Sequence, residues 1–296
     1  MGISKQAVYK MIKQLDTYYE QQEELLLMIQ QIRRDHPTMG VRDLYFKIQP
    51  AIMGRDAFER FCSYNNLMVS RIRNYSRTTD SSGVKRFPNL IQKLPITKIN
   101  QVWQSDITYF EVNGQFYYLT FIIDAYSRYL VGYSVSKTLT TKDTVIPALK
   151  MAIKFRKGVD LHNLIFHSDG GGQYYCKDFL KLTKHYGFQN SMCVEPWENG
   201  KAERLNGVMK NNYLTHRHVN TFEELVKGVA QVVHLYNFQK PHISLNRKTP
   251  SEFELMLSLQ TQKKSSETLN CKSENEPEHL VPAHFTQKKN SSSLPC

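Results

Sequence analysis

The sequence predicts an α/β protein with an all-α region at its N-terminus, because two kinds of apolar spacing occupy different parts of the chain. The first 75 residues carry the three- and four-residue spacing of helices. From residue 101 the spacing becomes that of strands, and helices and strands then alternate. The predicted segments are an N-terminal helical segment at 1–35, a helix-turn-helix-like domain at 36–75, a linker at 76–100, a core at 101–257 and a disordered tail at 258–296.

The core begins with strand patterns joined by Asn113-Gly114, which is the strongest short signal of a β-hairpin. Three antiparallel strands followed by a helix, a parallel strand and further helices is the order of a ribonuclease H-like α/β core. Thr249-Pro250-Ser251-Glu252 is a capping box that opens a short final helix, expected to end near Leu259. The predicted elements between these points are strands at 102–112, 115–124, 129–136, 161–167 and 189–194, and helices at 141–155, 177–186, 198–213 and 221–238.

Residues 3–35 predict one long helix with apolar residues at heptad spacing. Such a stripe suits a dimer contact, but it equally suits packing against the small domain that follows, and the sequence leaves both readings open. The stripe consists of Met11, Leu15, Tyr18, Gln22, Leu25, Ile29 and Ile32.

His36-Pro37 ends that helix, and helices predicted at 41–48 and 56–65 resemble a helix-turn-helix. Arginines on both sides of the second helix would reach phosphates on either side of a DNA groove. A small helical bundle with a solvated basic face is the alternative. The arginines predicted to bind DNA are Arg55, Arg71, Arg73 and Arg77.

The charge of the chain favours a polyanionic partner. Its net charge is +12, and residues 1–100 carry 16 Lys and Arg against 9 Asp and Glu. The five cysteines are scattered, without a Cys-x-x-Cys pair, so neither a disulfide scaffold nor a zinc knuckle is expected. No apolar run suggests a signal core or a membrane span, so we expect a cytoplasmic protein without a membrane partner.

Three acids on separate elements form the candidate site: Asp106 in the first strand, Asp169 at the end of a later strand, and Glu203 on the 198–213 helix. Oxygen-only ligands select hard cations such as Mg²⁺ or Mn²⁺ over zinc. Two such ions can activate an attacking oxygen and stabilise the leaving one in phosphoryl transfer. Each acid alone would fit a structural role, so only the combination of the three indicates a metal site.

The 198–213 helix has one polar face, formed by Asn199, Glu203, Asn206 and Lys210 at helical spacing. A solvated helix face is the simple explanation. If Glu203 belongs to a metal site, the same face would lie against DNA, with Asn199, Asn206 and Lys210 as contacts.

These motifs resemble the Asp-Asp-Glu core of retroviral integrases and insertion-sequence transposases, most closely the second-reading-frame (orfB-type) transposases of family three. The resemblance covers roughly residues 36–257. It departs in two respects: the 33 residues between Asp169 and Glu203 are slightly fewer than usual, and the retroviral zinc module is missing. The motifs are 36–42, 103–109, 124–128, 167–174 and 198–210, with Tyr236-Asn237, Pro241-His242, Leu245 and Thr249-Pro250.

The resemblance implies a transposase that nicks the ends of its mobile element and joins the freed 3′-hydroxyl to target DNA. Asp106 would bridge two Mg²⁺ or Mn²⁺ ions, Asp169 and Glu203 would complete one site each, and Lys210 would steady the DNA. The implied partners are the element's terminal inverted repeats, target DNA and further copies of the chain. Residues 3–9 resemble the tail of a recognition helix, so an upstream-frame DNA-binding protein is a further implied partner.

Two other functions remain open on the sequence. A ribonuclease H-like nuclease would cut without joining. An inactive DNA-binding regulator of transposition would do neither, although the presence of all three acids argues against it.

Overall fold

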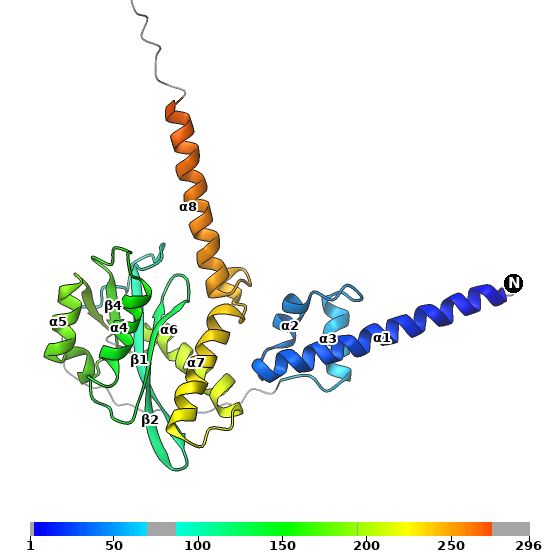
Figure 1. Cartoon of the computed structure of the whole chain (residues 1–296), viewed down its shortest axis with the longest axis horizontal. Coiled ribbons are helices and arrows are strands. Elements are labelled where there is room, and N and C mark those ends of the chain that lie inside the picture. The colour runs from blue at the N-terminus through cyan, green and yellow to red at the C-terminus, as the bar shows by residue number, and fades with distance from the viewer. Residues whose placement is uncertain (1–2, 70–86, 194, 274–296) are drawn as a thin grey trace, which may run out of the picture. The chain divides into compact units, whose positions relative to one another are not determined.

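The structure is a computed structural model that describes residues 3–69, 87–193 and 195–273 (Figure 1). It forms two compact units, Met1–Glu254 and Leu255–Cys296. None of the helices in these ranges is both long enough and apolar enough to cross a membrane.

A five-stranded sheet in the order β3-β2-β1-β4-β5 forms the centre of the first unit. The hairpin strands β1, β2 and β3 pair antiparallel, and β4 and β5 continue the sheet parallel to β1. This confirms the predicted ribonuclease H-like α/β core. The strands are β1 Val102–Val112, β2 Gln115–Asp124, β3 Leu130–Ser136, β4 Ile165–Ser168 and β5 Gln189–Met192.

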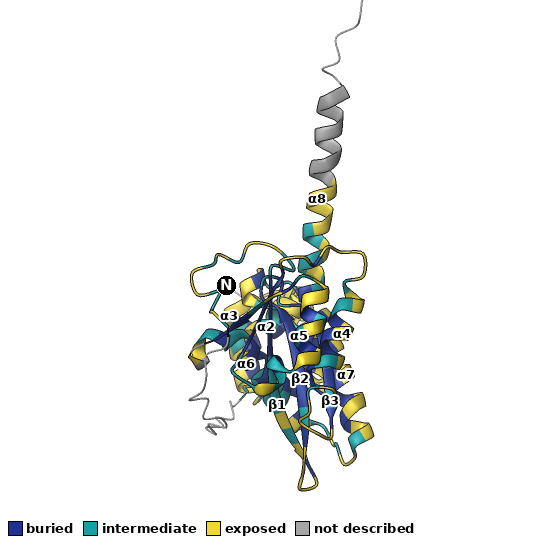
Figure 2. Cartoon of the chain, turned by 90° about the vertical axis from the view of Figure 1, so that its left-hand side faces the viewer, coloured by how far each residue is buried: buried dark blue, intermediate teal, exposed yellow. Residues whose placement is uncertain are grey.

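Helices cover both faces of the sheet, and alternate residues of β2 supply the two cores. Phe121 packs with Leu205 and Val232 of α6 and α7 on one face, while Ile122 packs with Leu149 of α4 on the other. Figure 2 shows buried residues running along the strands. The helices of the core are α4 Val145–Phe155, α5 Lys177–His185, α6 Gly200–Gly207 and α7 Phe222–Phe238, with short 3-10 turns at Gly172–Tyr175, Leu214–His216 and Ile243–Leu245.

The N-terminal residues form α1 Lys5–Asp35, α2 Val41–Ile48 and α3 Arg55–Tyr64. The second half of the heptad stripe, from Leu25 to Ile32, packs with α2 and α3 around Phe58. In the first half, Met11 and Leu15 are exposed. The C-terminal half of the stripe thus packs within the domain, and its N-terminal half leaves apolar side chains exposed.

Several polar contacts join these helices to the core inside the first unit. His36, the buried C-cap of α1, shares a 2.9 Å hydrogen bond between its Nδ1 and the Tyr213 hydroxyl. Arg247 forms a 2.6 Å ion pair with Asp43 of α2. The predicted helix break at His36-Pro37 therefore also anchors the N-terminal helices.

Part of the predicted linker is packed rather than free. Residues 87–101 have no regular secondary structure, yet Leu90, Ile91 and Leu94 pack beside Val102 and Ile165 at the sheet. Their irregular spacing carries no periodic signal, so the sequence pattern could not reveal this contact. Residues 70–86 lie outside the described residues.

The helix predicted at 198–213 is divided into three pieces. A 3-10 turn, Pro196–Asn199, leads into α6, and a π-helical segment, η3 Val208–Tyr213, follows it. A proline at the first position and a Glu195/Glu198 capping box explain the turn at the start. π-Helical segments are rare and often occur at functional sites.

The last helix, α8 Pro250–Ser273, runs beyond the predicted end at Leu259. The Thr249/Glu252 capping box is present, with hydrogen bonds of 2.8 and 3.2 Å. The expectation of a disordered tail from residue 258 is therefore wrong as far as Ser273. That expectation rested only on the low apolar content of the segment. Between Pro250 and Pro277 no Pro or Gly occurs, so no helix-breaking residue ends the helix early. Residues 274–296 lie outside the described residues.

Gly132 of β3 allows α4 to approach the sheet closely. A Cβ at this position would collide with the Ala148 carbonyl oxygen and lie 2.9 Å from the Ala152 Cβ. We expect Gly132→Ala to lower the free energy of unfolding by about 1–3 kcal/mol, since overpacking forces the helix outward. Gly207→Ala is the control because its added Cβ meets nothing within 4 Å. Urea denaturation that finds both variants equally stable would contradict this packing.

Candidate active site

Asp106 and Asp169 lie beside each other because β1 and β4 are parallel neighbours. Ser105 pairs with Ser168 in the register, so the two aspartates are the next residues along the two strands. Asp169 follows the last residue of β4. Both aspartates were predicted from the sequence to be metal ligands, and the sheet brings them together.

Gly171 fixes the conformation of the Asp169 carboxylate. Its backbone amide donates a 3.2 Å hydrogen bond to Asp169 Oδ1. A Cβ at position 171 would lie only 3.1 Å from the same oxygen. The glycine therefore permits an approach that a larger residue would disturb.

Helix α6 crosses β1 with the face that carries Glu203. Asn199 donates from Nδ2 to the Ser105 carbonyl at 2.9 Å, and Asn206 donates from Nδ2 to Asp106 Oδ2 at 2.8 Å. Glu203 lies between these two asparagines on the same face and is exposed. The polar face thus packs on β1 and is not merely a solvated surface.

Lys210 lies one turn further along this face, in η3. Its Nζ is 3.3 Å from the Tyr109 carbonyl and 4.9 Å from the centroid of the Tyr109 ring. Burial lowers the pKa of Lys210, and the charge of Asp106 opposes that effect. Lys210 therefore lies close enough to Asp106 to add positive charge at the edge of the acid cluster.

The three acids interact electrostatically. Burial raises the pKa of Asp106 to about 7, and the charges of Asp169 and Glu203 add to the effect. Burial also raises the pKa of Asp169, and burial and the Asp169 charge raise that of Glu203. Mutual repulsion of this kind favours a bound cation, because a cation stabilises all three charged forms.

The donor set fits a hard divalent ion, since it consists of carboxylate oxygens from three elements. Within the described ranges, no three His, Cys, Asp or Glu side chains are arranged to hold a metal ion as they stand. Asp106 and Asp169 are held by hydrogen bonds, among them those from Asn206 and from the Gly171 amide, whereas exposed Glu203 has room to change its rotamer.

Asn199 and Asn206 were predicted to contact DNA, and the structure corrects this. Both side chains are buried, with exposed fractions of 1% and 6%, and both bond to β1. Helical spacing identified the face correctly but gave no information about what covers it. Their place is between the helix and the strand, where they orient the site.

The predicted DNA contacts outside the core are described only in part. Arg55 begins α3 and pairs with Asp56 at 2.9 Å on the surface. A pair this exposed adds little stability, so Arg55 can exchange Asp56 for a phosphate. Arg71, Arg73 and Arg77 lie outside the described residues.

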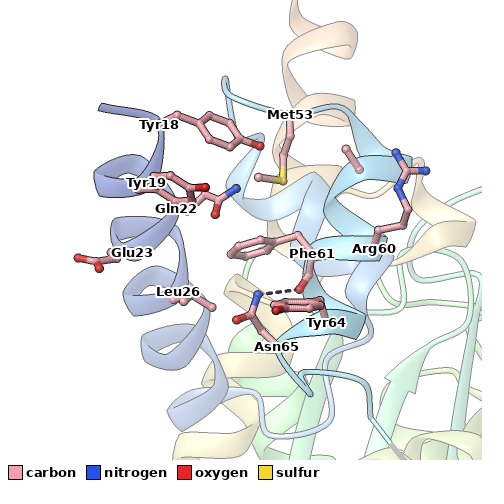
Figure 3. Close-up of a pocket in the computed structure, with 11 residues that line it drawn as sticks. Tyr18, Tyr19, Gln22, Glu23, Leu26, Met53, Arg60, Phe61, Tyr64 and Asn65 are labelled. Carbon is pink, nitrogen blue, oxygen red and sulfur yellow. Dashed lines mark hydrogen bonds between the residues drawn. The ribbon is translucent and has the colours of Figure 1, made fainter. Parts of the chain in front are cut away.

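Sequence reasoning missed Arg60, an exposed residue of α3. With Tyr64, it borders a hollow of about 470 Å³ between α3 and α1, whose other side carries Tyr18 and Tyr19 (Figure 3). Helical spacing could have shown that Arg60 is exposed, because it lies on the opposite face of α3 from buried Phe58. The hollow itself also needs α1, whose position depends on tertiary packing and has no local sequence signal.

Tyr174 is a second residue that the sequence analysis did not single out. It is buried, and its hydroxyl is 3.0 Å from Ser105 Oγ, next to Asp106. Its ring packs edge-on against Phe179 of α5. Tyr174 therefore supports the strand that carries Asp106 from the opposite face of the sheet.

Comparison with known proteins agrees with this geometry. Two family models described as "Integrase core domain" match residues 97–195 and 188–250. Together they span the sheet, the three acids and the helices behind them.

Among curated proteins, the chain is 28% identical to the "Insertion element IS600 uncharacterized 31 kDa protein" of Shigella sonnei, over 85% of this chain and 95% of that protein. It is 27% identical to "Putative transposase InsK for insertion sequence element IS150" of Escherichia coli K12, over 63% and 65%. It is 30% identical to "Transposase InsF for insertion sequence IS3A" of the same strain, over 52% and 54%.

Among solved structures, the chain resembles the "HTLV-2 integrase catalytic core domain in complex with magnesium", with 22% identity, a TM-score of 0.42, and coverage of 52% of this chain and 95% of that one. The sequence relatives and the two core-domain matches agree with each other. The chain thus has an integrase-type core and is similar to insertion-sequence transposases, those of family three among them.

Proposed function

We propose that this chain nicks the ends of its own mobile element and joins the freed 3′-hydroxyl to target DNA, using Asp106, Asp169 and Glu203. One observation carries the proposal. The parallel register of β1 and β4 sets two aspartates side by side, and α6 brings a third acid close enough to repel them.

The three carboxylates would hold Mg²⁺ or Mn²⁺, two ions in the arrangement used by many phosphoryl-transfer enzymes. When bound, the metal activates the attacking oxygen and stabilises the leaving oxygen. The chain's own residues do the rest of the work. Asn206 orients Asp106, Gly171 orients Asp169, and Lys210 supplies a charge for the DNA backbone beside the reacting phosphate.

Recognition of the element's ends falls to the N-terminal helices in this proposal. Exposed side chains of α3, among them Arg55 and Arg60, would read or clamp the DNA, and Arg71, Arg73 and Arg77 would add phosphate contacts. Further copies of the chain and an upstream-frame DNA-binding protein are the proposed protein partners.

A nuclease that only hydrolyses and an inactive regulator are the competing functions. Purified protein with labelled element ends and Mg²⁺ separates all three, because a transposase yields joined products, a nuclease yields nicks alone, and a regulator yields neither. Joined products are the expected result.

We expect Asp106→Asn, Asp169→Asn and Glu203→Gln each to reduce nicking and joining by at least about 10³-fold, as removal of a group essential to transition-state stabilisation does. Binding of end DNA should persist, since shape is kept and only charge is lost. Asp178→Asn, which changes an exposed acid of α5, is the matched control. Cleavage near the wild-type rate by any of the three would remove that residue from the site.

The raised pKa of Asp106 predicts a pH-dependent stability. In the folded protein the pKa is about 7 against 3.8 for the free side chain, so the folded state binds more protons between these values. Ionisation therefore weakens the fold as pH rises from about 4 to 7, by up to about 4 kcal/mol without metal. In EDTA, Asp106→Asn should therefore melt at a higher temperature than the wild type at pH 8, where Asp106 is charged. At pH 4, where Asp106 is protonated, the two should melt at similar temperatures.

Glu223→Gln, an exposed change of the same kind on α7, is the control for that experiment. Added Mg²⁺ should stabilise the wild type at pH 8 more than at pH 5, because protons compete with metal for the carboxylates. A melting-temperature difference between Asp106→Asn and wild type that is the same at both pH values would contradict the raised pKa.

The exposed first half of α1 predicts a contact between copies of the chain. Met11→Glu with Leu15→Glu should lower the mass measured by light scattering without lowering the melting temperature, since both side chains lie outside the domain core. Leu25→Ala should instead cost about 2–5 kcal/mol of stability, because Leu25 is buried. A mass that does not respond to the double substitution would exclude this face.

A further inference from the structure

A cavity of about 1180 Å³ lies along the side of α6 opposite Glu203. Lys201, Arg204, Leu205 and Val208 line it, and at 100° per residue they lie about half a turn away from the face that meets β1. The catalytic helix therefore separates the acid cluster from a second hollow. Neither the similarity to transposases nor the proposed chemistry gives this hollow a role.

Positive charge is concentrated in the cavity and is only partly compensated. Arg128, Lys201 and Arg204 line it, and within the described part of the chain their charged groups have no hydrogen bond or ion pair. Lys240 also lines it and donates only a 3.5 Å bond to the Pro241 carbonyl.

The two carboxylates that line the same cavity are engaged elsewhere. Asp43 pairs with Arg247 at 2.6 Å, and Glu198 accepts a 3.0 Å hydrogen bond from the Glu195 amide. The cations repel one another: burial lowers the pKa of Lys201 and the charge of Arg128 lowers it further, while the charge of Asp124 opposes this effect. An anion in the cavity would relieve that repulsion.

Three residues that line the cavity carry a buried polar atom without a hydrogen bond within the described residues: Asn89 at Nδ2, Gln104 at Oε1 and His242 at Nε2. Gln104 is the most deeply placed of them, with an exposed fraction of 2%. Gln104 lies two residues before Asp106 on β1, so it faces the same side of the sheet. Buried polar atoms without partners are uncommon, and a ligand with its own donors and acceptors would satisfy them.

An aromatic ring completes the cavity. Trp197 lines it and is 74% exposed, which is unusual for a tryptophan. Cations that track a phosphate backbone, combined with exposed aromatic rings for stacking, are the features of sites that bind single-stranded nucleic acid. Phosphate alone would satisfy the cations but would leave the ring and the buried atoms without a role.

We infer that this cavity binds an unpaired nucleotide of a DNA strand, with its phosphates at Arg128, Lys201 and Arg204 and its base on Trp197 near Gln104 and His242. A paired base keeps its edge inside the duplex, so only an unpaired or flipped-out base can reach the buried atoms. The inference rests on the proposed function, since nicking at an element end provides a strand that can separate. The cavity would hold that strand away from the acids.

The test measures binding of the full chain to fluorescein-labelled dT12 and to a random-sequence duplex in EDTA, so that no chemistry intervenes. Trp197→Ala should weaken dT12 binding about tenfold, the loss expected from one stacked base. Lys201→Gln with Arg204→Gln should weaken it at least as much and should reduce the slope of log affinity against log salt by about 1.4. Lys181→Gln with Lys227→Gln removes two exposed charges elsewhere and should have little effect.

Each of the following outcomes overturns the inference. Unchanged dT12 affinity in both cavity variants would exclude the cavity, and equal weakening of dT12 and duplex would make it a site for duplex phosphates. Displacement of dT12 by inorganic phosphate alone, with no effect of Trp197→Ala, would make it a simple anion site. If the wild type binds neither dT12 nor the duplex, the proposed function fails together with this inference. If the wild type binds the duplex but not dT12, only the inference about this cavity fails. Circular dichroism confirms that the variants fold.

Discussion

The parallel pairing of β1 with β4 is the constraint on which the rest of the site depends. It places residues 106 and 169, which are far apart in the sequence, at matching positions on adjacent strands. Parallel strands need a long connection, and here α4 provides it while covering the face of the sheet opposite α6. The hydrogen bond between Tyr174 and Ser105 supports β1 next to that pairing, and the close approach at Gly132 lets α4 pack on the same sheet. Burial raises the pKa of both carboxylates there, and the charge of Asp169 raises that of Asp106 further, so the sheet must hold the two acids in an unfavourable place.

Helix α6 completes the site through hydrogen bonds rather than through apolar packing alone. Asn199 binds a backbone carbonyl of β1, and Asn206 binds the Asp106 carboxylate itself. These bonds fix the rotation of the helix about its axis, which determines where Glu203 projects. A buried amide left without its partner would cost about 1–3 kcal/mol, so alternative rotations of the helix are disfavoured.

Much of this arrangement could be predicted from the sequence because its signals are local. The bounds of β1 and β2 follow from strand patterns on either side of Asn113-Gly114, and the spacing of Asn199, Glu203 and Asn206 follows from helix geometry. What covers each face is a tertiary property, so the asparagines were assigned to DNA although they pack on β1. The same limit applies to Leu90 and Ile91, which pack without a periodic pattern, and to α8, where helix propensity outweighed a low apolar content.

The two sides of α6 carry opposite charges, so in the proposed function one short helix would serve both the chemistry and DNA binding. On the side toward β1, acids repel one another and attract cations. On the opposite side, Lys201 and Arg204 have no acid bonded to them among the residues that the structure describes, and in the inferred site they would bind phosphates. Since the charges of Glu203 and Arg204 belong to adjacent residues, DNA held by the basic side is kept within a helix diameter, about 10 Å, of the acid side. A strand that crosses the end of the helix can thus present one phosphate to each side, and the helix itself sets the spacing between the two phosphates.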